Sequence, residues 1–228
     1  MDQQNANTAE SPRFHRLTGG QRAYLAVKYT LDFLIALIAA AVLLVPMVVV
    51  ALLIKLDDRG PVFFAQKRVG KDQKLFSMLK FRTMRMDTPR DMPTHLLADP
   101  QQYITRIGRF LRKTSLDELP QLINILMGKM SFVGPRPALW NQYDLNEQRE
   151  ACGVHQVRPG LTGWAQINGR VELEIPVKAA LDGEYVRNLG LKMDLRCFFG
   201  TFGIVLTGKG VVEGGTGELK RSSQERDI

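Results

Sequence analysis

The segment Arg112–Pro137 reads RKTSLDELPQLINILMGKMSFVGPRP and joins two adjacent carboxylates to an apolar run. Apolar residues at helical spacing predict a helix over Ser115–Met127, with a proline in its first turn. The two carboxylates, Asp117 and Glu118, are therefore expected at the start of that helix. The segment ends in Gly134–Pro137, a rigid turn that presents a single guanidinium.

Two interpretations of this acidic pair are open. Ser115 and Glu118 have the spacing of a capping box, and Asp117 in the first turn would complement the helix dipole. A basic cluster nevertheless surrounds the pair and needs an anion, and arginine side chains bind phosphate groups bidentately. In that setting a carboxylate serves either as a Mg²⁺ ligand or as a nucleophile that forms an acyl phosphate. The cluster consists of Arg109, Arg112, Lys113, Lys129 and Arg136.

The composition is that of one domain of ordinary size with a basic surface. The 228 residues include 31 Lys and Arg against 23 Asp and Glu, and the net charge of +8 favours anionic partners such as acidic lipid or phosphorylated substrates. The two cysteines are far apart and the three histidines are scattered, so neither a disulfide framework nor a Cys- or His-based metal site is expected. No nucleic-acid partner is expected, because there is no helix-turn-helix or zinc motif and aromatic residues do not alternate with basic ones.

The most hydrophobic stretch, Tyr29–Ile54, reads YTLDFLIALIAAAVLLVPMVVVALLI. As a helix it would be roughly 39 Å long, which is enough to cross a bilayer. Pro46 would remove a backbone hydrogen bond and bend that helix. Basic residues flank both ends, and such segments prefer the cytoplasmic side of a membrane. This pattern favours a helix that dips into the membrane and returns; a straight transmembrane helix stays open as the alternative, and a buried core helix is the weakest option.

Two strands are predicted after this stretch, over Val62–Val69 and Leu75–Thr83, around the turn Gly70–Gln73. Period-two alternation puts Lys80 and Arg82 on the same side of the second strand, either as solvated charges or as the basic wall of a site. The last helix of the chain is apolar enough over one half to lie on a membrane surface. Helices are predicted over Tyr103–Leu111, Trp140–Gly153, Val177–Asn188 and Leu191–Leu206.

Together these elements predict a mostly helical α+β fold. It comprises an N-terminal re-entrant membrane helix bent at Pro46, a small β-hairpin, and interfacial amphipathic helices around a compact catalytic domain. The expected organisation is a mobile N-terminal arm (residues 1–27), the re-entrant membrane helix (28–56), a cytosolic catalytic domain with interfacial helices (57–207) and a mobile C-terminal tail (208–228).

The chain contains an ordered set of short motifs: Lys28–Phe33, Gly60–Phe64, Lys80–Met84, Leu111–Asn124, Met130–Pro137, Arg158–Arg170 and Asp182–Asp194. Through this set it resembles the bacterial sugar transferases, the monotopic polyprenyl-phosphate phosphoglycosyl transferases, in their minimal catalytic form. Two positions depart from the family pattern. Lys129 stands where the family usually has an acidic residue, and Arg187–Gly190 replaces a more aromatic, Ser-containing run.

The resemblance implies transfer of a sugar-1-phosphate from a UDP-sugar to undecaprenyl phosphate with release of UMP, the first membrane step of glycoconjugate assembly. It implies that Asp117 is the nucleophile and a Mg²⁺ contact, and that Glu118 assists it. It also implies a location at the bacterial inner membrane, with the phospholipid bilayer as a partner and the catalytic domain facing the cytoplasm. The substrate-binding roles that it implies fall on Lys80, Arg82, Arg112, Pro135, Arg136, Arg158, Gln166, Arg170, Asp182 and Asp194.

A second class of function is open at this level, namely a non-enzymatic membrane-bound scaffold whose basic face recruits acidic lipid or partners. The apolar run and the net charge would suffice for it, but it has no use for Asp117 among arginines. Motifs do not encode the shape of a sugar pocket, so the sequence leaves the identity of the sugar open. It also leaves open whether the protein forms a homo-oligomer.

Overall fold

The computed structural model describes residues 14–88, 100–169 and 173–207, so most of the predicted arm and all of the predicted tail lie outside the described residues. In chain order its helices and strands are α1 (Gly19–Val42), α2 (Leu44–Asp57), β1 (Phe63–Val69), β2 (Leu75–Phe81), α3 (Arg106–Thr114), α4 (Gln121–Leu126), β3 (Ser131–Val133), α5 (Tyr143–Ala151), β4 (Gly160–Thr162), α6 (Trp164–Ile167), α7 (Ile175–Arg187) and α8 (Leu191–Thr207).

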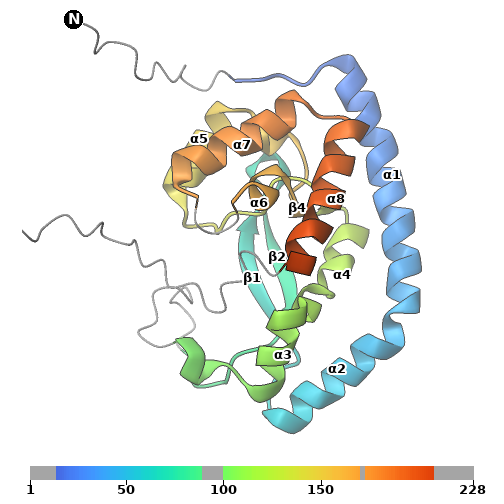
Figure 1. The fold of residues 1–228 in the computed structure, drawn as a ribbon, viewed down its shortest axis with the longest axis vertical. Coiled ribbons are helices and arrows are strands. Elements are labelled where there is room, and N and C mark those ends of the chain that lie inside the picture. The colour runs from blue at the N-terminus through green and yellow to red at the C-terminus, as the bar shows by residue number, and fades with distance from the viewer. Residues whose placement is uncertain (1–13, 89–99, 170–172, 208–228) are drawn as a thin grey trace, which may run out of the picture.

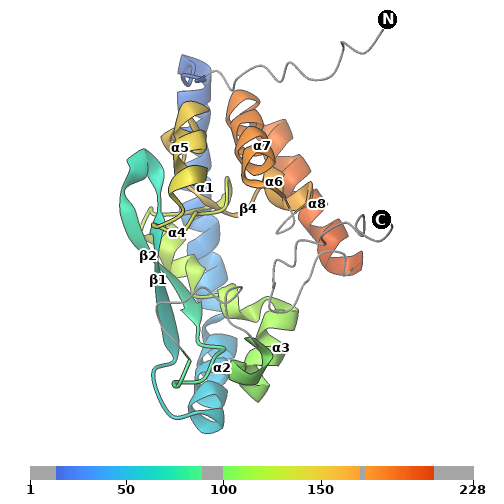
Figure 2. The same cartoon turned by 90° about the vertical axis from the view of Figure 1, so that its left-hand side faces the viewer.

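Helices α1 and α2 form a bent pair of helices along one side of the molecule, and the other elements lie within the bend (Figure 1). Seen from the side, the β1–β2 hairpin lies on one face, and α6, α7 and α8 lie on the other (Figure 2). The described residues are mostly helical, with two small two-stranded sheets, which confirms the predicted α+β class.

Helix α1 begins earlier than the sequence predicts because Thr18 caps it. The Thr18 hydroxyl accepts the Gln21 backbone N–H at 3.2 Å, and the Gln21 side-chain oxygen accepts the Thr18 N–H at 3.0 Å, which completes a capping box. The Gln21 amide also donates to the Val186 carbonyl at 3.1 Å and so ties this helix start to α7. Residues 19–27, expected in the mobile arm, are therefore part of α1.

The long apolar segment is broken at Leu43, where α1 ends and α2 begins. Leu43 has a φ of −88° and a ψ of 2°, and Pro46 follows three residues later. The proline has no N–H to donate to the carbonyl of Val42, and its ring would clash with that carbonyl in a continuous helix. The break that Pro46 predicts is therefore present, one turn before the proline itself.

One stripe of α1 faces the domain, and this stripe carries two of the charged residues of the helix. Lys28 and Asp32 are both buried in it. Lys28 Nζ lies 2.6 Å from Asp194 Oδ2 of α8, and the Ser131 hydroxyl donates to Asp32 Oδ2 at 2.6 Å. Apart from the exposed Arg22 near the start of the helix, the opposite face of α1 is largely apolar. Its exposed side chains include Val27, Leu31, Phe33, Leu34, Ile35, Leu37, Ile38 and Val42.

By its length and composition, α1 could cross a membrane, and it is the one helix among the described residues that meets this test. The exposed apolar surface continues from α1 onto α2. Its members on α2 are Leu44, Val45, Val48, Val49, Leu52, Leu53 and Leu56.

The β1–β2 hairpin confirms the predicted pair of strands. Its antiparallel register pairs Phe64 with Lys80 and Arg68 with Phe76, so alternation along the strands puts Arg68 and Lys80 on the same face. The second sheet was not predicted. It consists of β3 and β4 in parallel, and strands of three residues are too short to show a period-two pattern.

The segment around the acidic pair differs most from the prediction. The continuous helix predicted over Ser115–Met127 is wrong, because Ser115 has a φ of 58°, Leu116–Glu118 forms a 3₁₀ turn (η4), and α4 begins only at Gln121. Pro120 supplies the physical reason. It has no N–H for the carbonyl four residues back, so the preceding turn closes with tighter i to i+3 hydrogen bonds. The predicted capping box does not form, since the Ser115 side chain makes no capping hydrogen bond.

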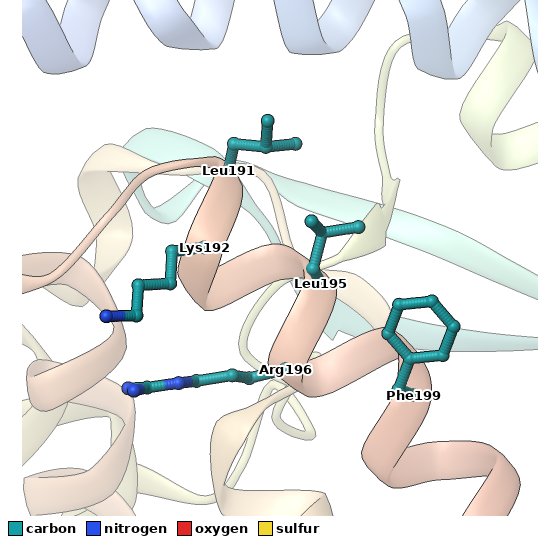
Figure 3. A pocket seen from close by; sticks show the side chains of 5 residues that line it. All are labelled: Leu191, Lys192, Leu195, Arg196 and Phe199. Atoms are coloured by element: carbon teal, nitrogen blue, oxygen red, sulfur yellow. The ribbon is translucent and has the colours of Figure 1, made fainter.

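Helix α8 carries exposed apolar side chains next to two basic ones. Leu191, Leu195 and Phe199 line an open hollow of about 610 Å³ together with Lys192 and Arg196. The two leucines point to one flank of the helix, and the two basic side chains point to another (Figure 3). This is the amphipathic pattern that the sequence predicts for the last helix.

Candidate active site

Three segments of the chain meet at the acidic pair. Glu118 in η4 lies between Lys80 of β2 and Arg136 of the loop after β3. Its Oε1 accepts hydrogen bonds from Lys80 Nζ at 2.8 Å and from Arg136 Nη2 at 2.7 Å. The neighbouring Asp117 has its Oδ2 3.8 Å from the same Lys80 Nζ. The fold thus brings the two carboxylates and two of the predicted cations into one cluster.

Asp117 is the less tightly held of the two carboxylates. It is only 8% exposed, and it accepts no hydrogen bond from any described residue. Burial raises the pKa of Asp117; the charge of Lys80 opposes this rise, and the charge of Glu118 adds to it. A desolvated carboxylate whose lone pairs are not committed to hydrogen bonds is suited to attack an electrophile or to bind a metal ion.

The pKa of Glu118 is shifted in the opposite direction from that of Asp117. Burial by itself would raise the pKa of Glu118, but the charges and hydrogen bonds of Arg136 and Lys80 outweigh burial and hold the pKa well below its usual range. The charge of Glu118 in turn raises the pKa of Arg136. Glu118 therefore stays ionised and fixes two cations beside Asp117, which is a different task from the helix capping considered for it.

Two more arginines stand close to this cluster. Arg112, at the end of α3, donates from Nε to the Thr83 hydroxyl at 2.8 Å, and its charge lowers the pKa of Asp117. Arg68 was not predicted as a site residue. Burial lowers the pKa of Arg68 to about 10, with a further lowering by the charge of Arg136. The signal that could have found it is alternation along β1, since Arg68 shares its face of the hairpin with Lys80.

A Mg²⁺ ion fits these residues only together with a substrate. The described residues hold no group of three or more His, Cys, Asp or Glu side chains that could bind a metal ion by themselves. Mg²⁺ is commonly held by one or two carboxylates, with the remaining ligands supplied by water and by substrate phosphates. Asp117, with both carboxylate oxygens free of hydrogen bonds from described residues, is the side chain that would hold it.

Three of the predicted substrate-binding residues lie away from the acidic pair or act through the backbone. The Arg82 guanidinium donates to the Asp58 carbonyl at the end of α2. The carbonyl of Pro135 accepts the Gly160 N–H at 3.0 Å, which holds the loop that presents Arg136. The Arg158 guanidinium lies over the Tyr29 ring, 4.0 Å from its centroid.

The remaining predicted residues are engaged inside the fold or lie outside the described residues. Gln166 donates to the Leu161 carbonyl at 3.0 Å. Asp182 is fully buried in an ion pair, with Arg149 Nη2 2.5 Å from its Oδ2. Asp194 accepts the hydroxyl of Tyr185 at 2.7 Å, besides its ion pair with α1. Arg170 lies outside the described residues.

The sequence profile of the bacterial sugar transferase family matches residues 23–208, a range that includes most of α1, all of α2, the hairpin and the acidic pair. The chain belongs to this family, which makes it an enzyme of the transferase class and confirms the resemblance stated from its motifs. The non-enzymatic scaffold is therefore not retained.

Similar proteins carry names of the same kind. The exopolysaccharide production protein PSS of Rhizobium leguminosarum bv. phaseoli is 44% identical over 199 residues, which are 82% of this chain and 98% of that protein. The uncharacterized sugar transferase EpsL of Bacillus subtilis is 44% identical over 158 residues, 69% of this chain and 76% of that protein. The UDP-glucose:undecaprenyl-phosphate glucose-1-phosphate transferase of Escherichia coli K12 is 42% identical over 66% of this chain, but the match spans only 34% of that longer relative.

Proposed function

We propose that this protein transfers a sugar-1-phosphate from a UDP-sugar to undecaprenyl phosphate and releases UMP, through a covalent phosphosugar intermediate on Asp117. The observation that carries the proposal is the contrast within the acidic pair. Glu118 is held by two cations, whereas Asp117 is buried beside them without a hydrogen bond from any described residue. Relatives named as UDP-sugar:undecaprenyl-phosphate transferases support the choice of substrates.

In the first half-reaction, a carboxylate oxygen of Asp117 attacks the β-phosphorus of the UDP-sugar. A new P–O bond forms while the bond from that phosphorus to the bridging oxygen breaks, and UMP leaves with the electron pair. Lys80 and Arg136, oriented by Glu118, are placed to bind the phosphate oxygens. When Mg²⁺ is bound, it supplies positive charge that shields Asp117 from the charge of the diphosphate.

In the second half-reaction, a phosphate oxygen of undecaprenyl phosphate attacks the phosphorus of the acyl phosphate. The P–O bond to Asp117 breaks, and the carboxylate is regenerated as the undecaprenyl diphosphate sugar leaves. The soluble donor and the lipid acceptor then never have to occupy the site together. This suits a site that a soluble substrate reaches from water and a lipid substrate reaches from the membrane.

An isotope exchange experiment tests the covalent step. Incubated with a UDP-sugar and labelled UMP but no lipid acceptor, the enzyme is expected to move label into the UDP-sugar, because the first half-reaction is reversible. EDTA should stop the exchange and Mg²⁺ should restore it. A panel of UDP-sugars would identify the donor. An enzyme that completes transfer to lipid but shows no lipid-independent exchange would contradict the covalent intermediate.

We also propose that α1 and α2 form a re-entrant membrane helix, with both ends at the cytoplasmic face of the bacterial inner membrane. Support comes from the break at Leu43, from the continuous apolar outer face of both helices, and from the basic residues at either end of the segment. The exposed apolar side chains of α8, flanked by Lys192 and Arg196, suit a helix that lies on the same surface.

Cysteine labelling tests this topology. Gly19→Cys and Arg59→Cys place a thiol at the start of α1 and just after α2. A Cβ at Gly19 would meet no atom within 4 Å other than those of its chain neighbours and the backbone of its own helix. The native Cys152 and Cys197 are both buried, so background labelling should be low. An impermeant maleimide should label both variants in inverted membrane vesicles and neither in spheroplasts. Labelling of one variant in spheroplasts would mean that the segment spans the membrane.

A further inference from the structure

A second basic hollow lies at the opposite end of α4 from the acidic pair. It has a volume of about 390 Å³ and is lined by α1, by the end of α4 and by Arg158. The acidic pair precedes α4, and the cations that lower the pKa of Asp117 are Lys80, Arg112 and Arg136. The resemblance implies a substrate-binding role for Arg158, but the hollow is not lined by the proposed catalytic cluster, and the two half-reactions proposed above do not use it.

Arg158 is held in this hollow with its charge available. Its guanidinium lies over the Tyr29 ring, 4.0 Å from the centroid, and its backbone N–H donates to the Tyr29 hydroxyl at 2.9 Å. Gly128 lets the guanidinium approach the chain, since a Cβ there would come within 3.3 Å of Arg158 Nη2. Among the described residues, no carboxylate forms an ion pair with Arg158. An anion would be attracted to this hollow.

Part of the wall of the hollow is apolar and adjoins the exposed apolar face of α1. Phe33 is 44% exposed and Met127 is 60% exposed, and both line the hollow. On α1, the hollow lies near the start of the exposed apolar face, whose first large member is Val27. Aromatic and basic side chains at such a boundary are typical of the headgroup level of a membrane.

We propose that this hollow binds the phosphate of an anionic phospholipid, with the headgroup against Arg158 and an acyl chain along Phe33 and the outer face of α1. The hollow joins a cation to an apolar track, and such a lipid offers both complementary parts. The acceptor lipid fits less well, because its phosphate must reach Asp117 before α4, whereas the hollow lies after α4. The proposal rests on the proposed membrane placement of α1 but not on the transfer reaction.

Native mass spectrometry of the full chain in detergent tests the site. Phosphatidylglycerol is added as the probe, with phosphatidylcholine as the zwitterionic comparison. The wild type should retain one phosphatidylglycerol in preference to phosphatidylcholine. Arg158→Gln should bind phosphatidylglycerol about tenfold more weakly, as expected for the loss of one charge-assisted hydrogen bond. Arg187→Gln, which removes an exposed cation at the end of α7, is the matched control and should bind it like the wild type.

A second variant tests the site independently in case Arg158→Gln does not fold. Met127→Trp fills the hollow at an exposed position without changing its charge, and it should also reduce phosphatidylglycerol retention. Equal retention by the wild type and both hollow variants would overturn the site. Displacement of phosphatidylglycerol by equimolar undecaprenyl phosphate would overturn its assignment to phospholipid. UMP exchange by the wild type is measured separately, so exchange without lipid retention refutes only the lipid site, and retention without exchange refutes only the proposed reaction.

Discussion

An Asp117→Asn variant is expected to lose at least about 10³-fold in turnover while unfolding at the same temperature as the wild type or at a higher one. The amide is nearly isosteric but cannot form the acyl phosphate, and removal of a nucleophile from other enzymes costs this much or more. UMP release from the UDP-sugar and thermal unfolding in the same detergent measure the two effects.

The expected gain in stability follows from the environment of Asp117. The side chain is buried and accepts no hydrogen bond from a described residue, and burial raises its pKa. A carboxyl whose pKa is raised in the folded state stabilises the fold fully below its unfolded pKa and loses that contribution as pH rises through the folded pKa. At neutral pH the ionised Asp117 therefore costs stability, and an uncharged amide removes this cost.

The matched control is Asp144→Asn, which makes the same chemical change at an exposed position of α5. It should retain the turnover and the unfolding temperature of the wild type. If Asp117→Asn lost turnover together with a marked fall in unfolding temperature, Asp117 would be a structural residue and the assignment of the nucleophile would fail. Undiminished turnover would refute that assignment directly.

The parts of the fold that could be predicted from the sequence are those marked by a clear local pattern of residue types. The hairpin follows from two β-rich runs around Gly70–Gln73, and the break between α1 and α2 follows from Pro46. The helix predicted over Ser115–Met127 is wrong for an equally local reason. The apolar spacing of the segment fits a helix, but Pro120 deprives the turn before it of a hydrogen bond, and this turn is where the acidic pair lies.

The arrangement of the site depended on tertiary contacts that spacing does not encode. The sequence grouped Arg112 and Arg136 with the acidic pair because they are close in the chain, and it left Lys80 either as a solvated charge or as part of the site. The fold places Lys80 in the cluster and adds Arg68 from the hairpin. Single-sequence patterns also could not separate a charge inside a site from one inside the core. Asp182 carries no local mark of its partner, since Arg149 lies 33 residues away on another helix.

The Arg149–Asp182 pair is expected to give the largest single effect on stability. Arg149 donates from Nε at 2.9 Å and from Nη2 at 2.5 Å to the same Asp182 oxygen, and both side chains are almost fully buried. Burial raises the pKa of Asp182 against the opposing charge of Arg149, so the ionised carboxylate depends on its partner. Arg149→Met should therefore lower the free energy of unfolding by about 3–5 kcal/mol, because it leaves a buried charge unpaired. For a domain of this size that is a fall of roughly 6–20 °C in the unfolding temperature.

The double variant Arg149→Met with Asp182→Leu separates the loss of a pair from the burial of an unpaired charge. Replacing both partners with apolar side chains removes the uncompensated carboxylate, so the double variant should unfold at a higher temperature than Arg149→Met alone. Arg85→Met is the matched surface control, since its ion pair with Asp87 is exposed on both sides and should contribute less than about 1 kcal/mol. If the double variant were no more stable than the single one, the Asp182 charge would have another partner, and a role in binding substrate would become the better account of Asp182.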